Sequence, residues 1–164
     1  MAALGERAVL VPIDGFHLAD AELRRLGRAE RKGAPDTFDA AGYMHLLRRL
    51  AERRDEVVYA PVFRRESELA EAGALPVPAS APLVVTEGNY LLLDGPFAAV
   101  RDLLTACWYV EVDPDVRRGR LVDRHVRHGR GAQQARDWVE HTDEPNARLV
   151  EACRDRADLV VRLP

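Results

Sequence analysis

The chain has 164 residues, of which 47% are hydrophobic and 31% are charged, an ordinary composition for a folded domain. A chain of this length buries about 70% of its unfolded surface, so we expect a single domain, residues 1–164. The net charge of -3 gives no reason to expect a nucleic-acid or membrane partner, and no apolar run approaches the roughly 20 residues of a membrane span. Two cysteines, Cys107 and Cys153, cannot form a disulfide framework, which favours free thiols in a reducing cytoplasm.

Short apolar runs recur along the chain, and each is bounded by turn residues. Most of these runs do not alternate in polarity, which is typical of strands that are buried on both faces. They alternate with helix-like segments, so the sequence predicts an α/β fold, a parallel sheet with helices on both faces. The predicted strands are residues 7–13, 82–87, 106–113 and 158–163, and a short strand or extended loop covers 56–63.

The clearest predicted helix follows Asp39, which is placed as its N-cap. Tyr43, Leu46, Leu47 and Leu50 are spaced i, i+3, i+4 and i+7, so one apolar stripe faces the core. The other predicted helices are residues 19–31, 115–127, 132–141 and 146–156.

Residues 64–82 differ from the rest of the chain. They hold three prolines, one glycine and many Glu and Ala residues. Proline and glycine interrupt regular structure, so we expect a surface excursion that contributes no core.

Acidic side chains stand at the ends of three predicted strands: Asp14, then Glu87 with Asn89, and Asp113. The carboxyl ends of parallel strands are where α/β folds bind their ligands. Each residue alone could simply cap a helix or turn, but three together favour a site. A carboxylate there could accept a proton from a hydroxyl group or hold a magnesium ion.

Residues 115–131 are strongly basic. Arg117, Arg120 and Arg124 are spaced i, i+3 and i+7, so they share one helical face. One interpretation is a solvated face in an arginine-biased chain that contains a single lysine, Lys32. The other is a mobile lid that clamps phosphates with planar guanidinium groups.

Two further kinds of site are unlikely on sequence grounds. His125 and His128 share a helix, but no cysteine or carboxylate stands at zinc-ligand spacing from them. A serine hydrolase is also disfavoured, because Ser67 and Ser80 are the two serines and neither lies in a Gly-x-Ser-x-Gly motif.

Five motifs then occur in an order that resembles a known family. They are "DGFH" (14–17), "RKGAPDTFD" (31–39), "YAPVF" (59–63), "VVTEGNYLLL" (84–93) and "DPDVRRGRLVDRHVRHGRG" (113–131). Together they resemble the P-loop kinases grouped as uridine kinase, pantothenate kinase and phosphoribulokinase, including bacterial proteins of the nucleoside or nucleotide kinase family. The resemblance implies a three-layer P-loop NTPase-like fold and ATP-dependent, Mg²⁺-dependent phosphoryl transfer to a small-molecule hydroxyl acceptor in the cytoplasm.

The resemblance also implies roles for individual residues. Asp14 matches the general base that acts on the acceptor hydroxyl, and Glu87 matches the carboxylate of the Walker B-like strand, a candidate Mg²⁺ ligand. The arginines that match the phosphate-holding lid are Arg117, Arg120 and Arg124, of which Arg120 and Arg124 are expected to act in catalysis. The residues expected to line the acceptor pocket are His17, Arg31, Lys32, Phe63, Glu87, Asn89 and Tyr90.

The acceptor is left open among a nucleoside, a sugar and a pantothenate-like alcohol. "RKGAP" resembles the pantothenate kinase loop more than that of the uridine kinases, which carry an aspartate where this chain has Gly33.

One family motif does not occur in the 164 residues: the Gly-x-x-x-x-Gly-Lys-Ser/Thr loop that cradles the nucleotide phosphates. We expect the strand that carries it to precede Met1 and to run between the strands at 82–87 and 106–112. Unpaired edges of those strands would favour self-association, so a homodimer is possible. The alternative function is a non-catalytic, pseudokinase-like module that binds a ligand but no nucleotide.

Overall fold

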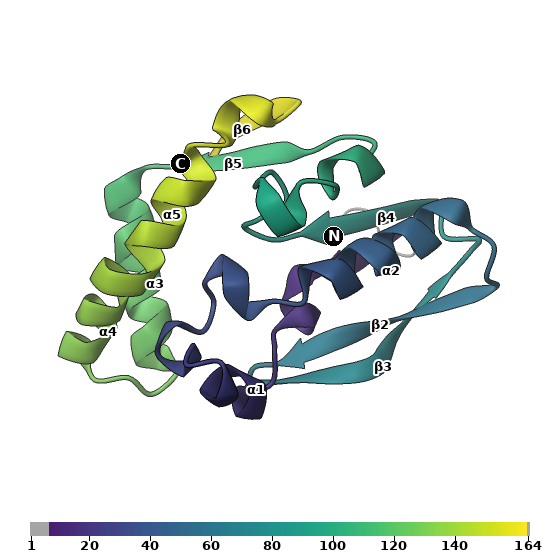
Figure 1. Cartoon of the computed structure of the whole chain (residues 1–164). Coiled ribbons are helices and arrows are strands. Elements are labelled where there is room, and N and C mark those ends of the chain that lie inside the picture. The colour runs from purple at the N-terminus through teal and green to yellow at the C-terminus, as the bar shows by residue number, and fades with distance from the viewer. Residues whose placement is uncertain (1–6, 164) are drawn as a thin grey trace. The chain divides into compact units, whose positions relative to one another are not determined.

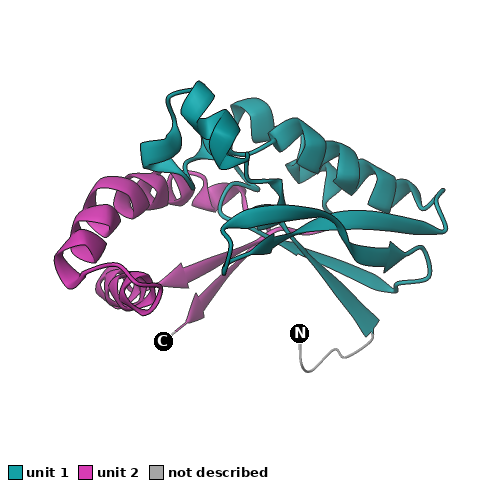
Figure 2. Ribbon diagram, turned by 90° about the horizontal axis from the view of Figure 1, so that it is seen from below, with its two compact units in different colours: residues 1–104 teal, residues 105–164 magenta. Residues whose placement is uncertain are grey.

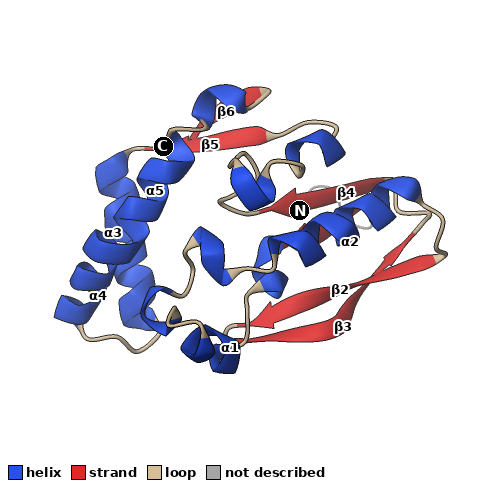
Figure 3. Ribbon diagram, viewed as in Figure 1, coloured by secondary structure: helices blue, strands red, loops and turns tan. Residues whose placement is uncertain are grey.

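The computed structural model describes residues 7–163, and the chain divides into two compact units (Figures 1 and 2). The first unit is residues 1–104 and the second is residues 105–164. Figure 3 shows that strands and helices contribute to both units. Within residues 7–163, no helix combines the length and the apolar character that a membrane span requires.

The first unit contains a parallel pair of strands. β1 (Ala8–Pro12) pairs with β4 (Leu83–Glu87), in a register that sets Ala8 opposite Leu83 and Pro12 opposite Glu87. The predicted parallel arrangement of strands is confirmed for these two apolar runs. It has one direct consequence for function, because both strands end at the same edge.

An antiparallel hairpin accompanies this pair. β2 (Val57–Arg64) pairs with β3 (Leu69–Pro78), and the register shifts between Ala60 and Val62. β3 lies inside the segment predicted to contribute no core, and that prediction is wrong at Val77, which is 2% exposed. The physical reason is pairing, since Val77 lies opposite the buried Val58 while the first half of β3 stays exposed.

Two helices complete the first unit, α1 (Asp20–Arg25) and α2 (Ala40–Glu52). Asp39 caps α2 as predicted, since its Oδ1 accepts a hydrogen bond from the backbone N–H of Gly42 at 2.8 Å. The apolar stripe of α2 faces inward as predicted, and its Leu46 packs in one core cluster with Val11, Val58, Ala60 and Val77. α1 is shorter than the predicted segment 19–31, which ends in a separate 3₁₀ turn.

The second unit contains the other parallel pair, β5 (Trp108–Val112) with β6 (Leu159–Leu163). Its helices are α3 (Pro114–Arg127), α4 (Ala132–Trp138) and α5 (Glu144–Glu151), and a π-helical turn joins α4 to α5. They lie beside one another in Figure 1.

The predicted burial of the 106–113 strand on both faces is wrong. Trp108 is 64% exposed and Val110 is 56% exposed. Both point to the same side of the β5–β6 pair, because side chains alternate along a strand. Among the described residues, too few pack against that side of the pair to bury Trp108 and Val110.

The placement of Val77 can be tested with a matched pair of substitutions in β3. Val77→Ala should lower the free energy of unfolding by about 1–3 kcal/mol, because it removes buried methyl groups from the core. Leu69→Ala, at a position 48% exposed, should change it by no more than about 0.5 kcal/mol. Urea unfolding measures both, and equally small losses would contradict a core role for β3.

Candidate functional site

The candidate site is built around the turn that follows β1. Residues Ile13–Phe16 form a 3₁₀ turn, and Asp14 lies within it beside the end of β4. Gly15 is buried against the hairpin, and a Cβ at this position would lie 2.5 Å from the backbone oxygen of Pro61. A side chain at position 15 would therefore push the turn and the hairpin apart.

The Asp14 carboxylate faces a cation. Arg65 Nη2 donates a hydrogen bond to Asp14 Oδ2 at 3.2 Å, and the Asp14 side chain is 31% exposed. Asp14 does not cap the next α-helix, because α1 begins at Asp20 and its N-cap is Ala19. Arg65 was not predicted from the sequence, although it lies two residues after the predicted Phe63.

Glu87 is a second carboxylate at this edge. The residue as a whole is exposed, while its carboxyl group is partly surrounded by protein atoms. Burial raises the pKa of Glu87, the negative charge of Asp14 raises it further, and Arg65 opposes both effects. Glu87 thus lies near enough to Asp14 and Arg65 for both charges to act on it.

These groups suit a hydroxyl substrate and a hard cation. Carboxylate oxygens are the ligands that Mg²⁺ prefers, and Mg²⁺ is usually held by one or two carboxylates together with substrate phosphates. Asp14 and Glu87 fit that donor set. No cluster of three or more potential metal ligands occurs in the described part of the chain.

An aromatic wall beside Asp14 consists of His17, Phe38 and Phe63. The Nδ1 atom of His17 lies 2.8 Å from the backbone oxygen of Asp14, and its ring lies 4.0 Å from that of Phe38 and 4.8 Å from that of Phe63, centroid to centroid. Burial lowers the pKa of His17, although its contact with Asp14 works in the opposite direction. At neutral pH, His17 therefore presents a neutral ring, and Phe38 is a member of this wall that the sequence did not single out.

Lys32 lies near the wall, but its ammonium group already donates hydrogen bonds to other residues. Its Nζ donates to Asp20 Oδ1 at 2.7 Å and to the backbone oxygen of Glu68 at 2.9 Å, and it lies 5.6 Å from the centre of the Phe63 ring. The hydrogen bond from Lys32 is the main cause that lowers the pKa of Asp20. Lys32 thus ties the segment before α2 to the hairpin.

The remaining predicted pocket residues of this unit are Arg31, Tyr90 and Asn89. Arg31 pairs with Asp36 at 2.7 Å on the surface. Tyr90 is buried and donates its hydroxyl to the backbone oxygen of Gly33, which fixes the loop before α2. Asn89 is exposed just beyond β4.

The predicted lid arginines lie on α3 in the second unit. Arg117 Nη1 lies 2.7 Å from Glu144 Oε1, an ion pair whose atoms are not aligned as a hydrogen bond. Arg120 and Arg124 are exposed. Asp113, the third acidic strand end, is the N-cap of α3, since its Oδ1 accepts hydrogen bonds from the N–H groups of the next turn.

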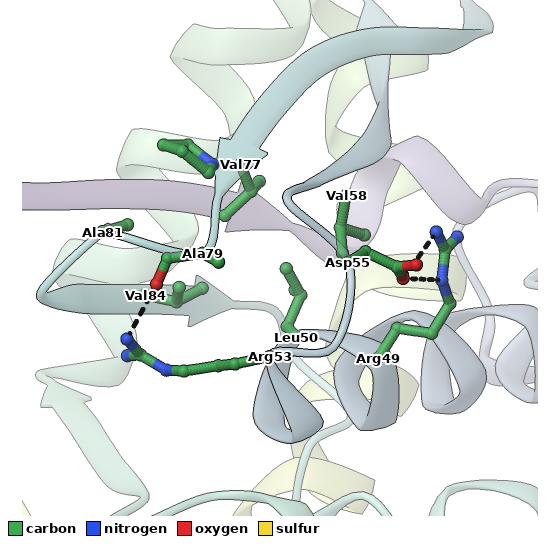
Figure 4. Close-up of a pocket in the computed structure, with 10 residues that line it drawn as sticks. Arg49, Leu50, Arg53, Asp55, Val58, Val77, Ala79, Ala81 and Val84 are labelled. Carbon is green, nitrogen blue, oxygen red and sulfur yellow. Dashed lines mark hydrogen bonds and ion pairs between the residues drawn. The ribbon is translucent and has the colours of Figure 1, made fainter.

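A shallow hollow, open to solvent, lies elsewhere in the first unit (Figure 4). It lies at the starts of β2 and β4, near Val58 and Val84, whereas Asp14 and Glu87 lie where strands end. Its arginines are engaged, because Arg49 pairs with Asp55 and Arg53 donates to the backbone oxygen of Ala79. None of the predicted site residues lines this hollow.

The lowered pKa of His17 leads to a testable titration. The unfolded chain takes up a proton near pH 6.5 that the folded chain takes up only at lower pH, so the free energy of unfolding should fall as the pH drops below about 6.5. In His17→Gln this part of the pH dependence should be lost, as measured by urea unfolding between pH 7.5 and pH 5. NMR of the ring protons, assigned with the same variant, should give a His17 midpoint below 6.5, and a midpoint at or above 6.5 would contradict the environment described.

Known proteins resemble the chain in both sequence and structure. The "ATP-dependent kinase-like protein notR'" of Aspergillus versicolor is 33% identical over 125 residues, which are 71% of this chain and 73% of that protein. The "Putative uridine kinase C227.14" of Schizosaccharomyces pombe is 30% identical over 160 residues, which are 93% of this chain and 68% of that protein. No protein-family model matches the chain.

Among solved structures, a "putative fructose transport system kinase" of Silicibacter sp. TM1040 superposes with a TM-score of 0.88 at 36% identity, over 99% of this chain and 78% of that one. Pantothenate kinases also match, and the chain spans 56% of the length of the one from Mycolicibacterium vanbaalenii, at 28% identity. These similarities confirm the predicted family and its α/β fold. The chain belongs to the P-loop kinases related to uridine kinase and pantothenate kinase.

Proposed function

We propose that the protein transfers the γ-phosphoryl group of ATP to a hydroxyl group of a small molecule, with Asp14 as the general base. The observation that carries this proposal is the position of the Asp14 carboxylate, which ends a strand beside Glu87 and next to the aromatic wall of His17 and Phe63. A hydroxyl group that enters along this wall meets a proton acceptor.

The proposed reaction is a direct displacement. Asp14 accepts the hydroxyl proton, the acceptor oxygen bonds to the γ-phosphorus, and the bond from that phosphorus to the bridging oxygen of ADP breaks. Mg²⁺ bound with the nucleotide would neutralise charge on the phosphates, and Glu87 is the carboxylate we assign to it. Positioning and charge stabilisation supply most of the rate enhancement in phosphoryl transfer, so the placement of these side chains matters more than their intrinsic reactivity.

The arginines of α3 are assigned to the transferring phosphoryl group. Arg120 and Arg124 are exposed on the helix, and planar guanidinium groups bind phosphate oxygens in pairs. Arg117 would have to leave Glu144 before it could join them.

The proposed acceptor is a small alcohol, and three types of alcohol remain candidates. The relatives are named for uridine, fructose transport and pantothenate. The neutral wall formed by His17, Phe38 and Phe63 suits the carbon skeleton or ring of any of these types.

A second candidate function is a ligand-binding module without phosphoryl transfer. It is favoured by the sequence of residues 1–164, which contains no Gly-x-x-x-x-Gly-Lys-Ser/Thr motif. The two candidates separate in a protein that carries this sequence together with such a loop, called the loop-bearing form below. Consumption of ATP that depends on one of the three acceptor types supports the kinase, whereas acceptor binding without consumption of ATP supports the module.

Replacement of Asp14 by asparagine tests the base. The amide keeps the size and polarity of the side chain but cannot accept the hydroxyl proton, so turnover in the loop-bearing form should fall on the order of a hundredfold to ten-thousandfold. The melting temperature should stay nearly unchanged, because Asp14 caps no α-helix and its partner Arg65 is half exposed. A stable Asp14→Asn enzyme that retains its activity would remove the proposed base.

Replacement of Arg120 by alanine tests the clamp. Turnover in the loop-bearing form should fall on the order of a hundredfold while the KM of the acceptor changes little, because the charge that Arg120 stabilises develops on the phosphoryl group. Arg136→Ala is a matched control in the same unit, since Arg136 contacts Gln133 at 3.0 Å on α4. Equal losses in turnover and acceptor affinity would place Arg120 at the acceptor instead.

A further inference from the structure

Two neighbouring arginines at the end of β2 have different partners. Arg64 Nε donates to Glu71 Oε2 at 2.7 Å, so this pair stays within the β2–β3 hairpin. Arg65 reaches out of the hairpin and contacts Asp14, which is 51 residues away along the chain. Both side chains are about half exposed, so burial does not explain the difference.

The hairpin is held against the Asp14 turn by contacts on both sides. Gly15 allows the backbone of Pro61 to approach, and the ring of Phe63 packs on that of His17. His17 in turn holds the backbone oxygen of Asp14 through Nδ1. These contacts hold together the two backbone segments that carry Arg65 and Asp14, so the packing of the chain brings the pair within reach.

We propose that Arg65 is a positioning residue for the reaction, which acts by holding the Asp14 carboxylate in the orientation that faces the acceptor hydroxyl. This inference rests on the proposed role of Asp14 as the base. It assigns a role to a residue of the hairpin turn, whereas the motifs of the sequence pointed to Phe63.

Arg65 is the cation that contacts the Asp14 carboxylate. Two neighbouring cations have other partners, because Lys32 is engaged with Asp20 and Glu68, and Arg64 with Glu71. The contact that can orient Asp14 is therefore the one from Arg65.

The contact restricts how the Asp14 carboxylate can turn. A carboxylate that rotates freely about its side-chain bonds spends less time in the productive orientation. The contact from Arg65 Nη2 occupies Oδ2 and leaves Oδ1 for the acceptor. A lysine at position 65 would keep the charge but lose the planar donor geometry, so it tests whether that geometry matters.

The kinetic test uses the loop-bearing form with three variants. In Arg65→Gln, kcat should fall on the order of tenfold while the KM of the acceptor changes little, because the base is less well oriented and the aromatic wall is intact. Arg65→Lys should restore only part of kcat. Arg64→Gln, which removes the adjacent arginine with its own carboxylate partner, should leave both kcat and KM unchanged.

A second measurement requires no activity and uses the 164-residue chain itself. At a fixed neutral pH, the NMR couplings of the Asp14 side-chain protons report how narrowly its χ1 angle is fixed. Arg65→Gln should average these couplings, because it removes the contact to Oδ2, whereas Arg64→Gln should leave them unchanged. Thermal unfolding of each variant checks that the fold is retained, as expected for a half-exposed turn residue.

The outcomes distinguish the inference from the proposed function. A loop-bearing form that phosphorylates no acceptor would refute the proposed function, and the side-chain couplings would still decide whether Arg65 orients Asp14. An active enzyme in which Arg65→Gln changes neither kcat nor the couplings would overturn the inference alone. Couplings that change equally in Arg64→Gln would also overturn it, because they would reflect a general effect on the hairpin.

Discussion

The first unit depends on the close approach of two backbone segments, at Gly15 and Pro61. There is no room for a Cβ between them, because such an atom would lie 2.5 Å from the Pro61 oxygen. This approach brings the hairpin against the turn that carries Asp14, where Arg65 contacts Asp14 and Phe63 packs on His17. Gly88 plays a matching role at the end of β4, where a side chain would collide with Ile13. Two glycines therefore determine how closely the carboxylates at the ends of β1 and β4 are enclosed.

Most basic side chains of this unit form an ion pair with a particular acidic side chain. Lys32 is held by Asp20 and Glu68, and Arg64 by Glu71. Isolated surface pairs of this kind contribute little to stability, about 0–1 kcal/mol each. Their value here is geometric, since they hold surrounding loops and leave the group of Asp14, Glu87 and Arg65 as the place where charges of both signs meet at a strand edge.

The sequence predicted the elements of the fold well because they depend on local patterns. The apolar stripe from Tyr43 to Leu50 repeats every few residues along one helix, and the cap at Asp39 lies directly before that helix. No distant contact is needed to recognise either feature. β3 was not predicted, because its first half is exposed and rich in Ala and Glu, and its one fully buried side chain, Val77, depends on pairing with Val58. The exposure of Trp108 and Val110 was also not predicted, since an apolar pattern indicates what a strand can bury and not what covers it.

The candidate site shows the same division between local and distant information. Asp14 and Glu87 were found because strand ends can be recognised from short motifs, and the parallel register brings those ends together. Arg65 and Phe38 were missed because their relevance comes from contacts with Asp14 and His17 that span 51 and 21 residues. This chain has a single lysine and many arginines, so the presence of an arginine does not by itself indicate a functional site. The partner that the arginine contacts in the structure is needed to single it out. The contrast between Arg64 and Arg65 follows from this, because two adjacent residues of one type contact different carboxylates.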